Sequence, residues 1–196
     1  ICDQDPAATF TATSATATSY VWSENGTGTN PTTSGSTAGN YTVVVLDGNG
    51  CTATATGVLT VNALPTVTVN SEAICTGDPA ATFTATSATA TVWTWSAQGT
   101  GSNQTTTGTT AGDYTVLVED INGCEASSTG TLTVNSLPTV TVNSEILCPD
   151  SPTPTFTATS TTATGWTWNP DGNENGTGTA QTTQGRDPGN YTVEVT

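Results

Sequence analysis

The sequence predicts an all-β protein without helix, built of tandem β-sandwich modules in a linear array. Three observations support this prediction. One pattern recurs at a step of 73 positions, so that Trp22, Trp95 and Trp168 are equivalent. Threonine alternates with valine, alanine, phenylalanine or leucine over short runs, which is the period of a strand with one buried face. Glycine and proline turns separate these runs at regular intervals, as in a sandwich of short strands.

The repeat divides the chain into three modules. Residues 1–63 form a first module that lacks its first strand, residues 64–136 form a complete module, and residues 137–196 form a third that lacks its last hairpin and strand. Leu64-Pro65 and Leu137-Pro138 mark the joints, which we expect to be short, extended and stiff because proline fixes φ and disfavours helix before it. The chain does not begin with methionine, and we expect it to be part of a longer protein.

The complete module gives the order of the first strands. Thr and Val alternate at 66–70, which predicts a first strand, and a second strand is expected at 82–86. Residues 92–96 predict a third strand, on which Trp93 and Trp95 share one face because they are two positions apart. The glycine, threonine and asparagine-rich segment that follows is predicted to hold one short edge strand.

A hairpin closes each module. Its first strand is predicted at 111–118, with equivalents at 38–45 and 188–195, where a small residue and glycine precede Tyr-Thr-Val. The turn contains Asn122-Gly123, and Asn-Gly tolerates the positive φ angles of a tight primed turn. The last strand of the module is expected at 130–135.

The five cysteines predict structural disulfides in an oxidising compartment. Cys2 and Cys51 are 49 positions apart, as are Cys75 and Cys124, and closing a loop of this size stabilises by about 4 kcal/mol in the entropy model. Without histidine or a Cys-x-x-Cys pair, a zinc site is disfavoured, and buried free thiols are the alternative. We predict the bonds Cys2–Cys51 and Cys75–Cys124 within modules, and for Cys148 a partner beyond the end of the chain.

The charge of the chain excludes several partners. The net charge is −15, from sixteen carboxylates and one cation, Arg186. Without a basic patch nothing neutralises phosphates, so nucleic acid is excluded as a partner. The same field opposes binding to anionic lipid, and no apolar stretch is long enough to insert in a membrane.

The residue types disfavour catalysis. An activated serine, threonine or cysteine needs a neighbouring base such as histidine or lysine, and the chain has neither. Aspartate and glutamate lie at predicted turns and repeat ends, where they are solvated. We therefore predict that the chain is not an enzyme and has no cofactor.

The third module contains a weak calcium-loop candidate. Asp171, Asn173 and Asn175 match the first half of a calcium loop, but Thr182 stands where a bidentate glutamate belongs. An ordinary polar loop is the interpretation we favour, because Asp, Asn and Gly are common in turns.

Two features bear on glycans. Trp93 and Trp95, or their equivalents, form either a sugar-stacking platform or part of the core, and we favour the core because a small sandwich has few other bulky residues. The platform fails if both rings lie between the sheets. Candidate glycosylation sites, which can also arise by chance in so Asn- and Thr-rich a chain, are Asn25, Asn40, Asn103, Asn175 and Asn190.

The order of these motifs resembles a known family over all 196 residues. The series Cys, Tyr-x-Trp or Trp-x-Trp, Ala-Gly-Asn/Asp-Tyr-Thr-Val, Asp-x-Asn-Gly-Cys and Leu-Thr-Val-Asn-x-Leu-Pro is similar to the PKD-like, immunoglobulin-like repeats of very large secreted adhesins, including those of gliding bacteria. The Gly-Asp-Gly that often follows the Trp in PKD domains is absent; residues 23–26 and 96–99 stand there instead. The resemblance implies tandem sandwiches exported to the cell surface.

Together these observations predict a non-catalytic extracellular fibre or stalk made of disulfide-stapled repeats. Its partners would be neighbouring repeats of the same protein, like fibres or surface glycans. The alternative is a glycan-binding adhesion module that uses the paired aromatics or the loops.

Overall fold

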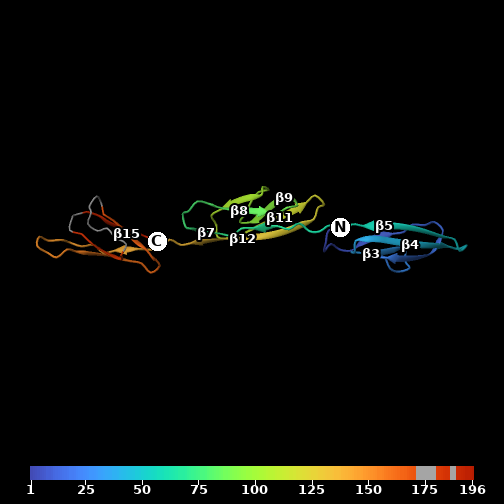
Figure 1. Ribbon diagram of the computed structural model, residues 1–196, viewed down its shortest axis with the longest axis horizontal. Helices are drawn as coiled ribbons and strands as arrows, with labels where there is room; N and C mark the ends of the chain where they lie inside the picture. Colours follow the sequence, from blue (N-terminus) through green and yellow to red (C-terminus); the bar gives the residue numbers. More distant parts are fainter. Residues whose placement is uncertain (171–179, 186–188) are drawn as a thin grey trace. The chain divides into compact units, whose positions relative to one another are not determined.

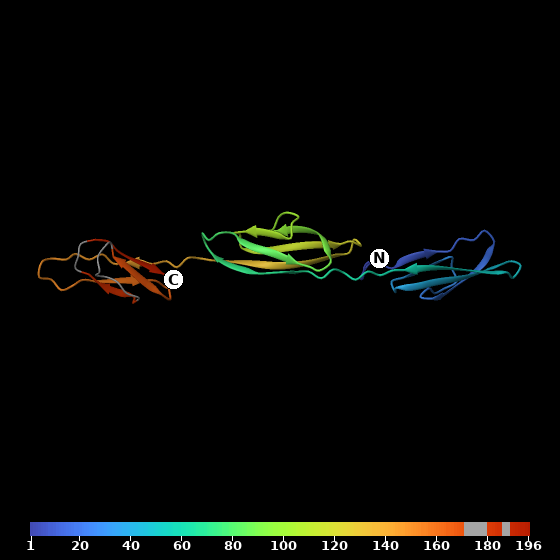
Figure 2. The same cartoon turned by 45° about the horizontal axis from the view of Figure 1, so that its top comes forward.

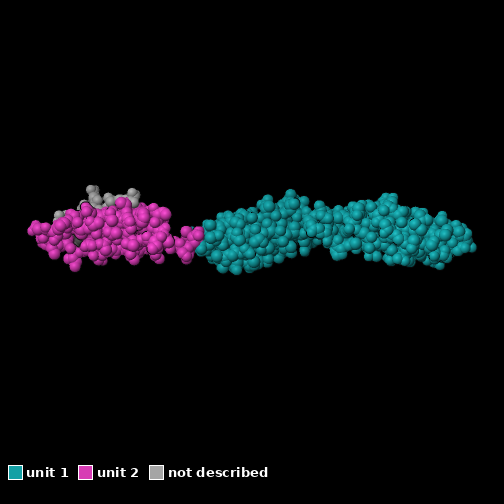
Figure 3. All heavy atoms as spheres, turned by 90° about the horizontal axis from the view of Figure 1, so that it is seen from below, with its two compact units in different colours: residues 1–74, 78–134 teal, residues 75–77, 135–196 magenta. Residues whose placement is uncertain are grey.

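The computed structural model describes residues 1–170, 180–185 and 189–196. These residues form β-strands joined by turns, and none of them is helical (Figure 1). Consequently no helix in this part of the chain could cross a membrane. The calcium-loop candidates Asp171, Asn173 and Asn175 lie outside the described residues. The chain forms two compact units, residues 1–74 with 78–134 and residues 75–77 with 135–196 (Figure 3), and each is described by itself.

The second repeat is a sandwich of two sheets (Figures 1 and 2). The first sheet has the order β10-β8-β6 and the second the order β7-β12-β11-β9. Their bounds are β6 (Thr68–Val69), β7 (Glu72–Cys75), β8 (Ala81–Thr86), β9 (Ala90–Ala97), β10 (Thr105–Gly108), β11 (Gly112–Asp120) and β12 (Glu125–Asn135). The pairs β11–β12 and β11–β9 are antiparallel. Because one face of each sheet carries the alternating apolar side chains, the core lies between the sheets.

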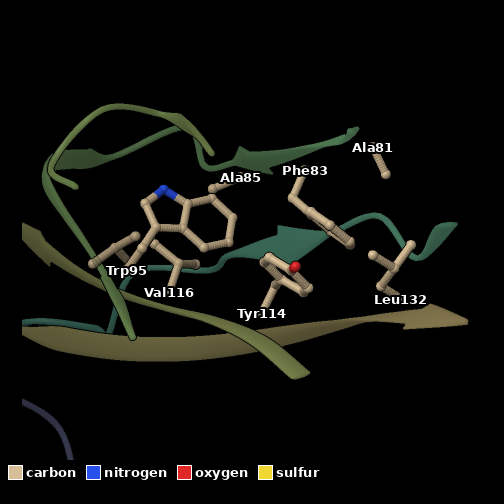
Figure 4. Close-up of a cluster of buried hydrophobic side chains, with 8 residues drawn as sticks. Ala81, Phe83, Ala85, Trp95, Tyr114, Val116 and Leu132 are labelled. Atoms are coloured by element: carbon tan, nitrogen blue, oxygen red, sulfur yellow. The ribbon is translucent and has the colours of Figure 1, made fainter. Parts of the chain in front are cut away.

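Aromatic side chains fill this core. Figure 4 shows Trp95, Val116 and Tyr114 directed toward Ala85 and Phe83. Phe83 and Tyr114 stack with their ring centroids 4.0 Å apart. The Tyr114 hydroxyl donates to the carbonyl oxygen of Thr110 at 3.0 Å, which is the tyrosine corner of immunoglobulin-like sandwiches.

The first repeat has the same plan with fewer strands. One sheet pairs β1 (Ala8–Thr11) with β3 (Thr32–Gly35), and the other has the order β2-β4-β5. The bounds of the latter are β2 (Ala17–Glu24), β4 (Gly39–Asp47) and β5 (Thr52–Leu59). Tyr41 repeats the corner with a 3.0 Å bond to Thr37 and stacks on Phe10. Residues 1–63 contain no strand equivalent to β6.

The third repeat lies in the second compact unit. One sheet has the order β13-β14-β16, and the other pairs β15 with β17. The bounds are β13 (Thr141–Val142), β14 (Thr155–Thr159), β15 (Trp166–Pro170), β16 (Thr182–Gln184) and β17 (Tyr191–Val195). Phe156 and Tyr191 stack at 4.2 Å, as in the other repeats.

The predicted all-β fold of tandem immunoglobulin-like sandwiches is confirmed. Each sheet takes its strands from one of the predicted repeats, although the boundaries at 63/64 and 136/137 stay a prediction. One local prediction was wrong, because the hairpin turn is not of the primed type. Gly123 has φ +80° and Asn122 is not among the residues with positive φ, so glycine follows an ordinary turn in a longer loop.

Candidate functional site

Cys124 is presented by a tightly bonded turn between β11 and β12. The Oδ1 atom of Asp120 accepts from the backbone N–H groups of Asn122 at 2.8 Å and Cys124 at 2.9 Å. The backbone of Asp120 pairs with Cys124 and Gly123 as well. Glycine provides the left-handed conformation that ends such a loop. The sequence Asp-x-Asn-Gly-Cys therefore fixes the position of the cysteine backbone.

Cys2 lies in the first repeat, beside the segment that follows β5. It forms a parallel β-bridge with Asn62, and the backbone N–H of Asp3 donates to the Asn62 carbonyl oxygen at 2.7 Å. The Asp5 carboxylate accepts from the Cys2 N–H at 2.7 Å. Because Asn62 comes just before Leu64, Cys2 lies at the end of the first repeat that leads into the joint.

A disulfide joins Cys2 to Cys124, with their Cα atoms 5.5 Å apart. It links the first repeat to the second and closes a loop with a sequence separation of 122. A loop of this size stabilises by about 5 kcal/mol in the entropy model, somewhat more than the predicted shorter loops. The bond is therefore a covalent staple across a joint.

The predicted pairings Cys2–Cys51 and Cys75–Cys124 were wrong. Cys51 precedes β5, whereas Cys2 bridges Asn62 beyond the other end of that strand. This length of extended chain spans about 30 Å, while a disulfide requires Cα atoms within about 7 Å. In the second repeat Cys124 is already bonded to Cys2, which excludes a bond to Cys75. Cys51 and Cys148 are exposed thiols.

The turn carboxylates favour their charged form. The hydrogen bond from the backbone N–H of Cys124 lowers the pKa of Asp120 below its ordinary value of 3.8. Desolvation raises this pKa by less than Cys124 lowers it, and hydrogen bonds from Asn122 lower it further. The backbone N–H of Cys51 likewise lowers the pKa of Asp47. Hydrogen bonds to a carboxylate stabilise its ionised form, so both turns are strongest when these groups are charged.

Acid is expected to weaken the turn that carries Cys124. Because the pKa of Asp120 is lower in the folded chain, its contribution is complete above about pH 5 and is lost as the pH falls below 3.8. We expect Asp120→Asn to lower the urea midpoint of the second repeat at neutral pH, and the difference from wild type to shrink below about pH 4. Equilibrium unfolding at several pH values checks this, and a difference that is independent of pH would contradict it.

The paired aromatics belong to the core. Trp95 is 5% exposed, and its indole N–H donates to the Asn103 carbonyl oxygen at 2.8 Å. Trp93 is partly buried and packs against the same cluster, with its ring nitrogen shielded from solvent. The first repeat repeats this arrangement with Trp22 buried and Tyr20 packed beside it. These aromatic pairs therefore do not present two open rings on which a sugar could stack.

The candidate glycosylation sites differ in their surroundings. The amide nitrogen of Asn25 donates to the Ala38 carbonyl oxygen at 3.2 Å, while Asn40, Asn103 and Asn190 are exposed. Asn175 lies outside the described residues. Glycosylation at these positions stays a prediction. Within residues 1–170, 180–185 and 189–196, no three Cys, Asp or Glu side chains gather as metal ligands would.

Comparison with known proteins finds only distant likenesses among solved structures. No family model matches the sequence, and no curated protein gives a significant match. A three-domain immunoglobulin structure of titin is 16% identical, with a TM-score of 0.39, over 95% of this chain and 77% of that chain. Extracellular domains 3–5 of Drosophila OTK are 14% identical, with a TM-score of 0.36, over 97% of this chain and 90% of that chain.

Sidekick-1 immunoglobulin domains 1–4 are also 14% identical, with a TM-score of 0.34, over all of this chain and 71% of that chain. Identities and scores this low transfer no function to the chain. The fold described here is defined by its own strand order, aromatic cores and tyrosine corners, and its function has to be argued from its own site.

Proposed function

We propose that this chain is a segment of a non-catalytic extracellular fibre or stalk whose modules are stapled together by disulfides between repeats. The observation that carries the proposal is the Cys2–Cys124 bond. A disulfide within one sandwich protects that sandwich alone, whereas this one connects two successive repeats. Persistent structural disulfides are typical of secreted and cell-surface proteins, which supports an extracellular location.

The staple determines how the fibre would bear tension. When the chain is pulled from its ends, force passes from Cys2 to Cys124 through the sulfur atoms and bypasses residues 3–123. The first repeat and most of the second then cannot be drawn out into extended chain, even if their sheets open. A stalk that keeps its length under load is the role that this covalent route supports.

The surface suits exposure outside the cell. Threonine hydroxyls pair across the outer faces, as between Thr42 and Thr56 at 2.9 Å and between Thr115 and Thr129 at 2.8 Å. A protease that cleaves after lysine or arginine has one target residue in the sequence, Arg186. The charge of −15 keeps such chains soluble and mutually repelling. The proposed class is that of the large secreted surface adhesins that the motifs resemble, and the proposed partners are neighbouring repeats of the same protein.

Small-angle scattering tests the stalk. Stiff Leu-Pro joints and modules about 40 Å long predict a rod with a radius of gyration of about 35 Å. A compact globule of 196 residues would have a radius of gyration of about 16 Å. Peptide mapping without reductant, on the same sample, should recover Cys2 joined to Cys124. A compact particle would contradict the stalk, and absence of that disulfide peptide would contradict the staple.

A further inference from the structure

The two sulfur atoms of the Cys2–Cys124 disulfide lie in unequal surroundings. Cys124 is 0% exposed, although it ends a turn, whereas Cys2 is half-buried. A thiol reduces a disulfide when its thiolate attacks one of the two sulfur atoms and the other sulfur leaves as a thiolate. Because burial blocks access to Cys124, attack is directed to Cys2, and Cys124 is the leaving group.

The leaving group is held in place by bonds that do not involve sulfur. Asp120 Oδ1 accepts from the backbone N–H of Cys124 at 2.9 Å, and the Asp120 backbone N–H donates to the Cys124 carbonyl oxygen at 3.0 Å. Asp120 itself is 8% exposed. When the S–S bond breaks, the turn therefore keeps Cys124 in position, close to a carboxylate and shielded from water. Burial and negative charge both disfavour a thiolate, which makes Cys124 a poor leaving group.

The attacked residue has anchors of its own. Cys2 forms a β-bridge with Asn62, and the backbone N–H of Asp3 donates to the Asn62 carbonyl oxygen at 2.7 Å. The Asp5 carboxylate accepts from the Cys2 N–H at 2.7 Å, and the Asp5 backbone N–H donates to the Cys2 carbonyl oxygen at 3.1 Å. These bonds also survive when the S–S bond breaks, so Cys2 keeps its place in the first repeat.

A short joint keeps the two anchored residues near each other. Asn62 bridges Cys2, and after four further residues Val67 packs against the core of the second repeat. Of the residues between them, Pro65 is buried and Leu64 is half-buried, and proline fixes φ. The sulfur atoms therefore cannot move far apart while both repeats are folded.

We propose that this joint reseals its own disulfide: when a thiol attacks Cys2, the anchored Cys124 displaces that thiol again. This inference rests on the proposed function of the bond as a staple between repeats. It states what controls the bond, namely the folding of the turn and of the bridge that hold the two cysteines. The staple then persists at thiol concentrations that reduce the same disulfide in the unfolded chain.

The exchange can be written with glutathione as the thiol. Its thiolate forms a bond to Cys2 Sγ, the Cys2–Cys124 bond breaks, and its electron pair leaves with Cys124, which takes up a proton. In resealing, the Cys124 thiolate attacks the same Cys2 sulfur and glutathione leaves as a thiolate, so nothing is oxidised or reduced overall. Net reduction requires a second glutathione to attack the mixed disulfide, so that oxidised glutathione leaves and Cys2 becomes a thiol.

Glutathione equilibria measure the resealing. The full chain, with its other three cysteines replaced by serine, is equilibrated in buffers of increasing reduced and decreasing oxidised glutathione, then quenched with acid and mapped. The readout is the squared concentration of reduced glutathione divided by that of oxidised glutathione at half reduction. We expect this value to be at least about 1000-fold higher for the folded chain than in concentrated urea, where a sequence separation of 122 keeps the cysteines apart.

A matched pair of variants tests the turn anchor. Asp120→Ala removes the acceptor of the Cys124 N–H and is expected to lower the half-reduction value about tenfold, because Cys124 is then held less firmly. Asp47→Ala is the control, since Asp47 Oδ1 accepts from the backbone N–H of residue 51 at 2.8 Å in the equivalent turn, away from the staple. We expect Asp47→Ala to change the value less than twofold.

A second pair tests the other anchor and separates it from charge. Asp5→Ala removes the acceptor of the Cys2 N–H and is expected to lower the half-reduction value several-fold. Asp3→Ala removes the same charge from the same segment but keeps the backbone bond to Asn62, and little change is expected. Hydrogen exchange of the β11 amides verifies that each variant is folded. If Asp120→Ala does not fold, the pair at Asp5 and Asp3 decides.

The outcomes separate this inference from the staple itself. If the unreduced chain contains the Cys2–Cys124 peptide but is half reduced at the same glutathione ratio folded and unfolded, resealing is overturned and the staple stands. Equal shifts within both pairs of variants would overturn the assigned anchors. If the Cys2–Cys124 peptide is missing before reduction, the proposed staple is overturned, and resealing falls with it.

Discussion

Reduction of the Cys2–Cys124 bridge is expected to add about 400 Å to the length to which the chain can be pulled. The bridge closes a sequence separation of 122, and each residue of extended chain adds about 3.4 Å. With the bridge intact, only the residues after Cys124 can be drawn out. Force spectroscopy with handles at the two ends, with and without reductant, measures this difference directly.

Two variants identify the bond responsible. Cys124→Ser is expected to give the long extension without reductant, because Cys2 then has no partner. Cys51→Ser is the matched control, since it removes an exposed thiol from an equivalent turn and leaves the bridge in place. A wild-type length that does not change on reduction, or a short extension of Cys124→Ser, would contradict the staple.

The fold could be predicted from the sequence because its signals are local and repeated. Alternation at period two, turn residues and three copies of the Tyr-Thr-Val strand predict short antiparallel strands with one buried face. The burial of Trp95 also follows, because a sandwich of this size has few other large side chains for its core. Each of these inferences concerns residues close in sequence or equivalent in every repeat.

The disulfide could not be predicted in the same way. In a repeated sequence, the distance from the first cysteine of a module to its second is the same in every module, whether the disulfides form within modules or between them. Equal spacings therefore cannot distinguish disulfides within modules from disulfides between modules. The contact that determines the pairing is the β-bridge between Cys2 and Asn62. It places Cys2 at the end of the first repeat that leads into the joint. This β-bridge joins residues that are 60 positions apart in the sequence, and the repeat pattern does not predict it.

The hairpin turn shows a second limit. Asn-Gly is compatible with a primed turn and also with a longer loop in which glycine alone is left-handed. The structure takes the longer loop, because Asp120 then accepts two backbone N–H groups and fixes Cys124. Asp120, rather than the Asn-Gly pair, is the residue that could have indicated the longer loop. An aspartate side chain commonly accepts a hydrogen bond from the backbone N–H two residues further along the chain.

Gly108→Ala is expected to unfold the second repeat under conditions in which wild type is stable. Gly108 ends β10 beside the ring of Tyr114, and a Cβ atom there would overlap the tyrosine hydroxyl and lie 2.6 Å from Cζ. Tyr114 cannot yield easily, because it is 1% exposed, stacks on Phe83 and donates to Thr110. Either the sheets move apart or the buried hydroxyl loses its acceptor.

The expected loss of stability combines three effects. Overpacking a well-packed core costs about 1–3 kcal/mol, and a buried hydroxyl without a partner costs about 1–3 kcal/mol. The lower entropy of alanine in the unfolded chain returns about 0.4–1 kcal/mol. We therefore expect Gly108→Ala to lower the free energy of unfolding of this repeat by about 2–4 kcal/mol, which is much of the stability of a domain of this size.

Hydrogen exchange of the β11 amides reports on this repeat alone, and its loss of protection measures the change. In the first repeat, where the β4 amides give the same readout, Gly48→Ala is the control, because the nearest atom to its Cβ would be Thr18 Cγ2 at 3.9 Å, and we expect a change within about 0.5 kcal/mol. Gly35→Ala should reproduce the large effect in the first repeat, since its Cβ would overlap the Tyr41 hydroxyl. If Gly108→Ala left the protection of the β11 amides unchanged, or Gly35→Ala changed that of the β4 amides no more than Gly48→Ala does, the tyrosine corner would not be the rigid element of the sandwich.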